Sequence, residues 1–220
     1  MSLPTYLDLV NDILVRLREP EVTTVQENVL SKLIGKLVND SKRQVEDAYN
    51  WNALTATLTA VTQANTFNYG LTGIGQRFKV IDAYNYTAKW PLRPASTVVL
   101  NKMFLEGGTT PETGSPQYYN FNGLTAQGDT QVDVFPVPTS AETLFFNLYV
   151  PQDALVNDSD ALYVPSEPVI LGAYARALVE RGEDGGLNSS EAYGLYRASL
   201  ADHIANEASR YVEEETWEAV

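Results

Sequence analysis

The sequence predicts an α+β fold, with a helical bundle formed by the N- and C-terminal helices and an inserted antiparallel β-sandwich or barrel-like domain. Apolar residues recur every three or four positions near both ends of the chain, as on one face of a helix. In the middle of the chain the period becomes two, and Gly, Pro, Asn and Asp interrupt it at close intervals. We therefore assign residues 1–53 and 165–220 to the helical bundle and residues 54–164 to the β domain.

Two helices are expected before the β domain. Ser2 is a suitable N-cap for the first helix, and Pro20 ends it. The second helix runs from about Gln26 to Tyr49, and Gly35 within it marks either a weak point or a close approach of another backbone. Because the segment that follows offers the first helix no obvious partner, we expect that helix to pack against the C-terminal helices.

Short strands are expected through the middle of the chain. The clearest is 54-LTATLTAV-61, where apolar residues alternate with threonines. Residues 96–108 are the exception, because a serine cap and terminal glycines predict a short helix there. The stretch 73-GIGQRF-78 lacks the third glycine and the following helix of a nucleotide-binding loop, so we expect a hairpin turn. The remaining strand-like segments are residues 67–69, 77–87, 117–121, 131–137 and 143–150.

Helical periodicity returns after the β segment. The stretch from Ser166 to Arg181 is apolar on several sides, which predicts a helix buried on more than one face. The glycine-rich sequence 182-GEDGG-186 separates it from a final helix, which Ser189 or Ser190 caps and which extends to about Glu214. These two helices complete the expected bundle.

The charge of the chain is uneven. Residues 1–110 carry 11 basic and 10 acidic side chains, whereas residues 111–220 carry 4 basic and 18 acidic ones, which together give the net charge of −13. The acidic half disfavours wrapping of nucleic acid, because it repels phosphates. The chain has no cysteine, which excludes disulfides and cysteine-based metal sites. It also lacks the long apolar run of a membrane span and the basic N-terminal region of a signal peptide, so we expect no membrane association.

No catalytic residue, metal site or cofactor is predicted. The single histidine, His203, lies in the expected last helix and has no cysteine or second histidine to share a metal with. The neighbouring carboxylates Glu46 and Asp47 do not face each other on a helix, and we expect both on a solvated face. The acidic turn 157-NDSD-160 lacks the spacing of a calcium-binding loop.

Two features could serve binding. Aromatic residues cluster in and near the turns of the β segment, and they fill either a thin core or an interface; the interface candidates are Trp90, Tyr118 and Tyr119. The second feature is the C-terminal sequence 211-YVEEETWEAV-220, in which an aromatic anchor accompanies an acidic run, as in segments that order on a basic partner.

The order of the sequence signals resembles that of the tailed-phage head-to-tail connector, or adaptor, proteins, specifically the tail tubular protein A-like proteins of short-tailed phages. The shared elements begin with "VNDIL" and "EP" near the N-terminus and a helix that ends at Asn50–Trp51. They continue with "GSPQYYNFNG", "VDVFPVP" and "LFFNLYVPQDAL…YVPSEPVILGAYARAL", so the resemblance covers nearly the whole chain.

The resemblance implies a structural virion protein without enzymatic activity, located in the tail or neck of the virion and in the host cytoplasm during assembly. It implies a homo-oligomeric ring, a dodecamer, that binds the portal protein on one side and the tail nozzle protein on the other. DNA would pass through the lumen without sequence-specific binding. The C-terminal segment would reach the portal through Tyr211, Glu213, Glu214, Glu215, Trp217 and Val220.

Two other functions remain open at this point. A carbohydrate- or receptor-binding tail module would use the aromatic loops of the β domain, and it predicts a pocket lined by Trp90 and the tyrosines. A hydrolase would need two carboxylates that converge in a cleft. Neither function requires a flanking helical bundle, which favours the connector.

Overall fold

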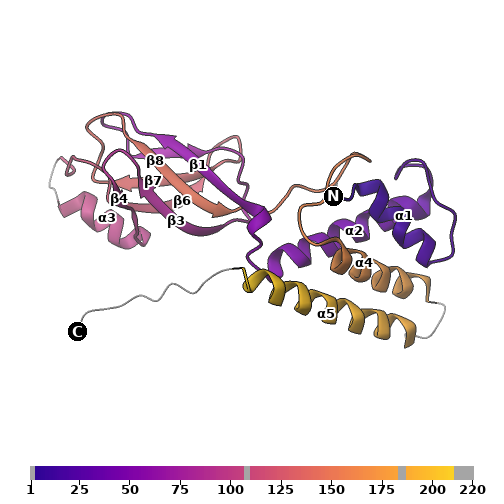
Figure 1. Ribbon diagram of the computed structural model, residues 1–220. Coiled ribbons are helices and arrows are strands. Elements are labelled where there is room, and N and C mark those ends of the chain that lie inside the picture. Colours follow the sequence, from indigo (N-terminus) through magenta and orange to yellow (C-terminus); the bar gives the residue numbers. More distant parts are fainter. Residues whose placement is uncertain (1–2, 107–109, 183–186, 211–220) are drawn as a thin grey trace, which may run out of the picture. The chain divides into compact units, whose positions relative to one another are not determined.

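A computed structural model describes residues 3–106, 110–182 and 187–210. The chain folds into two compact units. A helical unit combines Met1–Leu54 with Pro151–Val220, and a β unit comprises Thr55–Val150 (Figure 1). The described residues form helices that flank a β segment in sequence, which confirms the predicted α+β fold.

In the described part of the helical unit there are four α-helices, and the first of them is capped by Thr5 rather than by Ser2. Thr5 and Asp8 form a reciprocal capping box, in which the Thr5 side chain accepts from the Asp8 amide and the Asp8 carboxylate accepts from the Thr5 amide at 2.9 Å. The hydrogen bond that the Thr5 hydroxyl donates to the Asp8 carboxylate at 2.7 Å, followed by the one from the Thr5 amide, lowers the pKa of Asp8. The elements are α1 (Tyr6–Arg16), α2 (Val29–Ala48), the short 3₁₀ turn η1 (Asn52–Leu54), α4 (Ser166–Arg181) and α5 (Leu187–Ala208).

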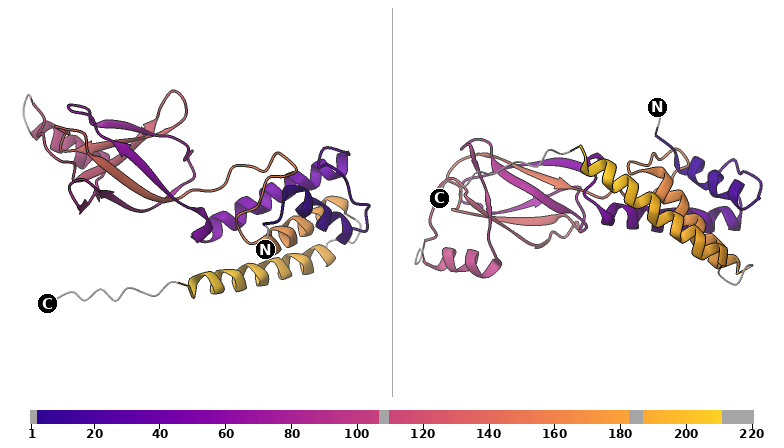
Figure 2. Two further views of the ribbon diagram at one scale, coloured as in Figure 1. Left: turned by 45° about the horizontal axis from the view of Figure 1, so that its top comes forward. Right: turned by 60° about the horizontal axis from the view of Figure 1, so that its bottom comes forward.

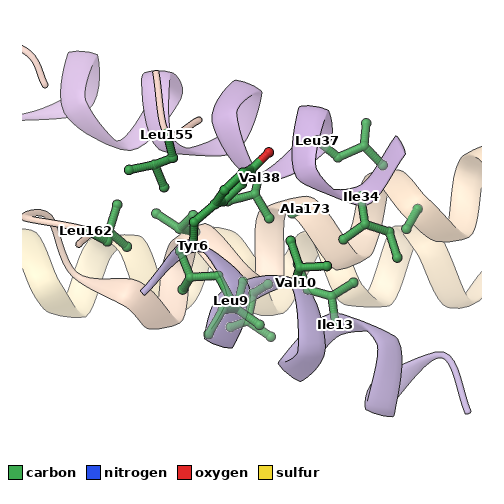
Figure 3. Packing of buried hydrophobic residues seen from close by; sticks show 14 of the residues in the cluster. Tyr6, Leu9, Val10, Ile13, Ile34, Leu37, Val38, Leu155, Leu162 and Ala173 are labelled. Atoms are coloured by element: carbon green, nitrogen blue, oxygen red, sulfur yellow. The ribbon is translucent and has the colours of Figure 1, made fainter. Parts of the chain in front are cut away.

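The N-terminal helix packs where the sequence predicted. The apolar stripe of α1 is buried against α2 and α4, and Figure 3 shows side chains of α1 and α2 facing one another beside Ala173 of α4. Helix α5 covers α4, so N-terminal and C-terminal helices share one core. Figures 1 and 2 show α4 between α5 and α1. The labelled core residues of Figure 3 from α1 and α2 are Tyr6, Leu9, Val10, Ile13, Ile34, Leu37 and Val38.

Residues 151–164 belong to the helical unit, although the sequence analysis placed them in the β domain. Leu155 and Leu162 are buried in the helical core. The Asn39 side chain accepts from the backbone N–H of Leu155 at 2.8 Å and donates to its carbonyl at 3.0 Å. The Tyr6 amide at the start of α1 donates to the carbonyl of Asp160 at 2.8 Å. These long-range contacts fix the position of residues 151–164. The segment has no repeating pattern of apolar residues, so the sequence carries no periodic signal for it.

The described residues of the β unit form two four-stranded sheets. The first has the order β1 (Thr55–Val61), β8 (Thr143–Tyr149), β3 (Lys79–Asn85), β4 (Trp90–Pro91), and all its pairs are antiparallel. The second has the order β2 (Asn68–Leu71), β7 (Thr130–Phe135), β6 (Tyr118–Leu124), β5 (Arg93–Pro94), in which only β5 and β6 are parallel. Helix α3 (Thr97–Glu106) contacts β6 and β7.

The inner faces of the two sheets form the core of the β unit, as the period of two predicted. Strand β8 alternates between buried and half-buried residues along its whole length, and Phe146 in its centre is fully buried. The prediction of a hairpin turn at residues 73–78 is wrong. Strands β2 and β3 lie in different sheets, so this glycine-containing stretch carries the chain from one sheet to the other. Trp90, one of the aromatic residues expected in or near turns, lies in the short strand β4, which β5 follows closely.

Candidate interaction surfaces

The aromatic residues singled out in the sequence lie on strands rather than in loops. Trp90 is half-buried on β4, and its indole N–H donates to the carbonyl of Pro116 at 2.9 Å. Tyr118 is half-buried on β6 opposite Phe135. Tyr119 is only 5% exposed and meets Phe146 edge to face at 5.7 Å between ring centroids. Burial, together with the negative charge of Asp82, raises the pKa of Tyr119.

A groove of about 520 Å³ lies in the β unit and is lined by residues of β3, β6 and the segment that carries β4 and β5. Tyr119 contributes to its wall, but Trp90 and Tyr118 are not among the residues that line it. This groove is therefore not the Trp90-lined pocket expected of a carbohydrate-binding module. Most of the lining is apolar and includes Val80, Ile81, Pro91, Leu92, Pro94 and Phe121.

The sequence analysis missed this groove, although β3 carries a signal for it. Val80 and Ile81 are adjacent apolar residues in a strand, where alternation would send one of them outward. The register of β3 against β8 shifts between Val80 and Asp82, which marks a bulge at Ile81. As a result both side chains remain accessible, with 39% of Val80 and 42% of Ile81 exposed.

Two buried carboxylates of the β unit are held separately by neutral donors. Glu142 accepts from the Asn85 side chain at 2.6 Å and from the Ser115 hydroxyl at 2.7 Å. Asp133 accepts from the side-chain amides of Asn68 and Asn122, the latter at 2.7 Å. Neither carboxylate lines the groove. The described residues thus fix these acids in structural roles, tying loops and strands together, rather than converging them in a cleft as the hydrolase alternative required.

A buried ion pair lies in the helical unit at a place that was expected to face solvent. Glu46 is 3% exposed and Lys42 is 2% exposed, and their side chains meet at 2.8 Å. The Lys42 ammonium also donates to the carbonyl of Gln152 at 2.6 Å, and Glu46 accepts from the Gln152 amide at 3.2 Å. The solvated position predicted for Glu46 is therefore wrong. Lys42, one helical turn earlier, supplies the countercharge that makes burial possible.

Among the described residues of the helical unit, α2 and α5 present exposed apolar side chains, as do α1 at Val15 (55% exposed) and α4 at Val179 (65% exposed). On α2, Val29 is 84% exposed and Leu33 is 37% exposed. On α5, Tyr193 is 51% exposed and Leu195 is 56% exposed. Helix α5 buries only the stripe that contacts α4, so the rest of its circumference is open among the described residues. Exposed apolar side chains on different helices of one core are suited to contacts with other protein chains.

No metal or membrane site emerges from the part of the chain that the structure describes. His203 is half-buried on α5, with Nδ1 at 2.8 Å from the carbonyl of Ser199 and Nε2 at 4.0 Å from Glu167. Within the described ranges there is no group of three metal-binding side chains. None of the helices described is both long enough and apolar enough to cross a membrane. The predicted tail contacts, Tyr211, Glu213, Glu214, Glu215, Trp217 and Val220, lie outside the described residues.

Comparison with known proteins identifies the family. A family model described as SU10 adaptor protein matches residues 4–216, which is nearly the whole chain and spans both units. Among curated proteins, none matches. The family match supports the head-to-tail adaptor resemblance, and the tail tubular protein A-like subtype stays a prediction. The chain therefore belongs to the SU10 adaptor protein family and has the structural role of an adaptor in a bacteriophage particle.

Proposed function

We propose that the chain assembles into a dodecameric ring that joins the portal to the tail nozzle and leaves a passage for DNA. Membership of the SU10 adaptor protein family over residues 4–216 is the observation that supports this most strongly. An adaptor between two symmetric assemblies must contact both of them and further copies of itself. A closed ring satisfies these requirements with one kind of subunit.

The two apolar surfaces of the helical unit are suitable subunit contacts. In a ring, each subunit presents one patch to the neighbour on one side and a different patch to the neighbour on the other. The surface of α2 that contains Val29 and Leu33 supplies one patch, and the surface of α5 that contains Leu195 supplies the other. The two patches lie on different helices, α2 and α5, which both pack against α4.

The acidic half of the chain suits the wall of a DNA passage. Residues 111–220 carry 18 acidic side chains and only 4 basic ones. A wall of like charge repels the phosphates of DNA and lets the double helix slide without binding. A neutral or basic lumen in the electrostatic map of an assembled ring would contradict this part of the proposal.

Native mass spectrometry of the purified chain with the portal of the same phage tests the ring. We expect twelve copies of the chain on one portal. Leu33→Asp and Leu195→Asp place a charge on each proposed patch, and each should abolish ring formation without unfolding the chain. Val156→Asp is the matched control, because Val156 is an exposed apolar residue (66%) in a loop of the same unit. A chain that stays monomeric in the presence of this portal would overturn the proposal. A ring that still forms with both variants would overturn the assignment of the two patches.

A further inference from the structure

The groove of the β unit is bordered by two incompletely paired strands. Strand β3 pairs with β8 along its length, but on its other side β4 pairs only with Tyr84 and Asn85. Strand β6 pairs with β5 only at Tyr118 and Tyr119. Within the described residues, the segment from Val80 to Asp82 therefore has no strand partner on the side of the groove. Such an edge is a template for pairing with an extended segment of another chain.

The chemistry of the groove combines an apolar floor with a basic rim. Val80 and Ile81, both about two-fifths exposed, stand beside the buried aromatic wall. The segment 77–95, which supplies β3 to β5, carries four basic residues and one acidic residue, Asp82. Lys79 directly precedes the lining residue Val80, and Arg93 stands between the lining residues Leu92 and Pro94. Both side chains are exposed. A fitting ligand is therefore an extended, acidic peptide with an apolar anchor.

The chain itself contains a segment of this kind. Ten residues, 211-YVEEETWEAV-220, follow Arg210, the last residue that the structure describes. They carry four glutamates and no basic side chain, together with the apolar residues Tyr211, Val212, Trp217, Ala219 and Val220. Glutamates complement the rim and Trp217 is a suitable anchor for the apolar floor.

We propose that residues 211–220 of one copy bind in the β-unit groove of a second copy. The inference rests on the proposed ring, because the ring supplies the second copy at high local concentration. It assigns the acidic segment a contact within the ring, in place of the portal contact that the sequence resemblance implied. Each subunit would then be linked to its neighbour by a tail as well as by helical surfaces.

Cysteine cross-linking is a direct test, because the chain contains no cysteine of its own. Full-length Ile81→Cys and Ala219→Cys chains are mixed in equal amounts with the portal and oxidised mildly. Disulfides between positions 81 and 219 are then quantified by mass spectrometry. The matched control replaces Ile81→Cys by Thr59→Cys. Thr59 is exposed on β1, the opposite edge strand of the same sheet. We expect at least a tenfold excess of 81–219 disulfides over 59–219 disulfides.

The charge of the rim gives a second test with the same readout. Lys79→Glu combined with Arg93→Glu should lower the yield of 81–219 disulfides about tenfold or more while the ring still forms. Raising the salt concentration should lower the yield of 81–219 disulfides in chains that keep Lys79 and Arg93. The reason is that salt screens exposed charges, over ~8–10 Å at physiological ionic strength. An excess of the synthetic peptide 211–220 should compete with the tail and reduce cross-linking in the same way.

Three results would overturn the inference while leaving the ring intact. The first is an equal yield of 59–219 and 81–219 disulfides, and the second is cross-linking of position 219 to the portal alone. The third is an 81–219 disulfide that forms within one chain rather than between two copies. The last is detected with a double Ile81→Cys/Ala219→Cys chain mixed with isotopically labelled copies. If no ring forms, the proposed function fails first. In that case binding of the synthetic peptide to the unassembled chain, measured with a fluorophore on Ile81→Cys, still decides whether the groove accepts this segment.

Discussion

The substitution Gly35→Ala tests how closely α1, α2 and the intervening loop pack. A Cβ atom at Gly35 would lie 2.3 Å from the hydroxyl oxygen of Tyr6 and 2.9 Å from a methyl carbon of Val25. Tyr6 is 5% exposed and Val25 is fully buried, so neither side chain can move aside into solvent. The sequence left two explanations for this glycine, and the structure supports close approach, by side chains rather than by a backbone.

The expected effect of Gly35→Ala is a balance of two terms. Overpacking a buried site costs about 1–3 kcal/mol. Alanine in place of glycine inside a helix returns about 0.5–1 kcal/mol. We therefore expect a net loss of up to about 2.5 kcal/mol in the free energy of unfolding, which corresponds to a fall of up to about 10 °C in Tm for a chain of this length. Gly194 is the matched control, because it also lies inside a helix and an added Cβ would meet nothing within 4 Å. Gly194→Ala should raise stability by about 0.5–1 kcal/mol.

Thermal and urea unfolding followed by circular dichroism at a helical wavelength measures both variants, because the helices report mainly on the helical unit. The difference between Gly35→Ala and Gly194→Ala isolates the cost of overpacking. Tyr6→Phe in the Gly35→Ala background removes the closest oxygen and should restore part of the stability. If Gly35→Ala stabilised the chain as much as Gly194→Ala does, the packing described around Tyr6 would be wrong.

Three further predictions concern the helical unit. Lys42→Met should destabilise it by about 3–5 kcal/mol, because it removes the Lys42 ammonium that pairs with the buried Glu46 carboxylate at 2.8 Å. Lys42→Met combined with Glu46→Leu should recover most of the loss, and equal urea midpoints for the single and double variants would contradict this. The pKa of Asp158 is lowered by a hydrogen bond from the Thr24 side chain and then by one from the backbone N–H of Val25. The contribution of this carboxylate to stability is therefore present above the ordinary aspartate pKa. It is lost as the pH falls through the lower pKa that Asp158 has in the folded chain. Asp158→Asn should therefore flatten the acid side of the stability profile below about pH 5, and an unchanged slope would show that this carboxylate is not involved. Trp51→Phe removes the 2.7 Å hydrogen bond from the indole N–H to the carbonyl of Val45 in the last turn of α2. This change should lower the free energy of unfolding by about 1–3 kcal/mol, measured by the same unfolding experiment. No loss of stability would mean that the Val45 carbonyl finds another donor.

Much of the fold could be predicted because its elements repeat a local pattern. The helix predicted from Ser166 to Arg181 has those bounds in the structure, and the alternation in 54-LTATLTAV-61 identified β1. The shared core of N- and C-terminal helices followed from unpartnered apolar stripes. In contrast, the first cap was assigned to Ser2 instead of Thr5, and the last helix begins at Leu187 instead of after a serine. Several residue types can cap a helix, so the sequence alone does not choose among neighbours.

The interaction surfaces could be predicted less well, because they depend on residues that are distant in sequence. Glu142 is fixed by Asn85, 57 positions earlier, and no local pattern records such a pair. Glu46 was misplaced because its burial depends on the return of residues 151–164 over α2. The aromatic residues were correctly noticed, but only the sheet register shows that Tyr119 points into the core while its neighbour Tyr118 stays half-buried.

The most direct test of the account is cryo-electron microscopy of the neck of intact phage particles, at a resolution that separates the helices. We predict a closed dodecamer of this chain between portal and tail nozzle, with α2 of one copy against α5 of the next and an open central passage. A neck without a ring of this chain, or copies found only at another place on the particle, would contradict the central claim.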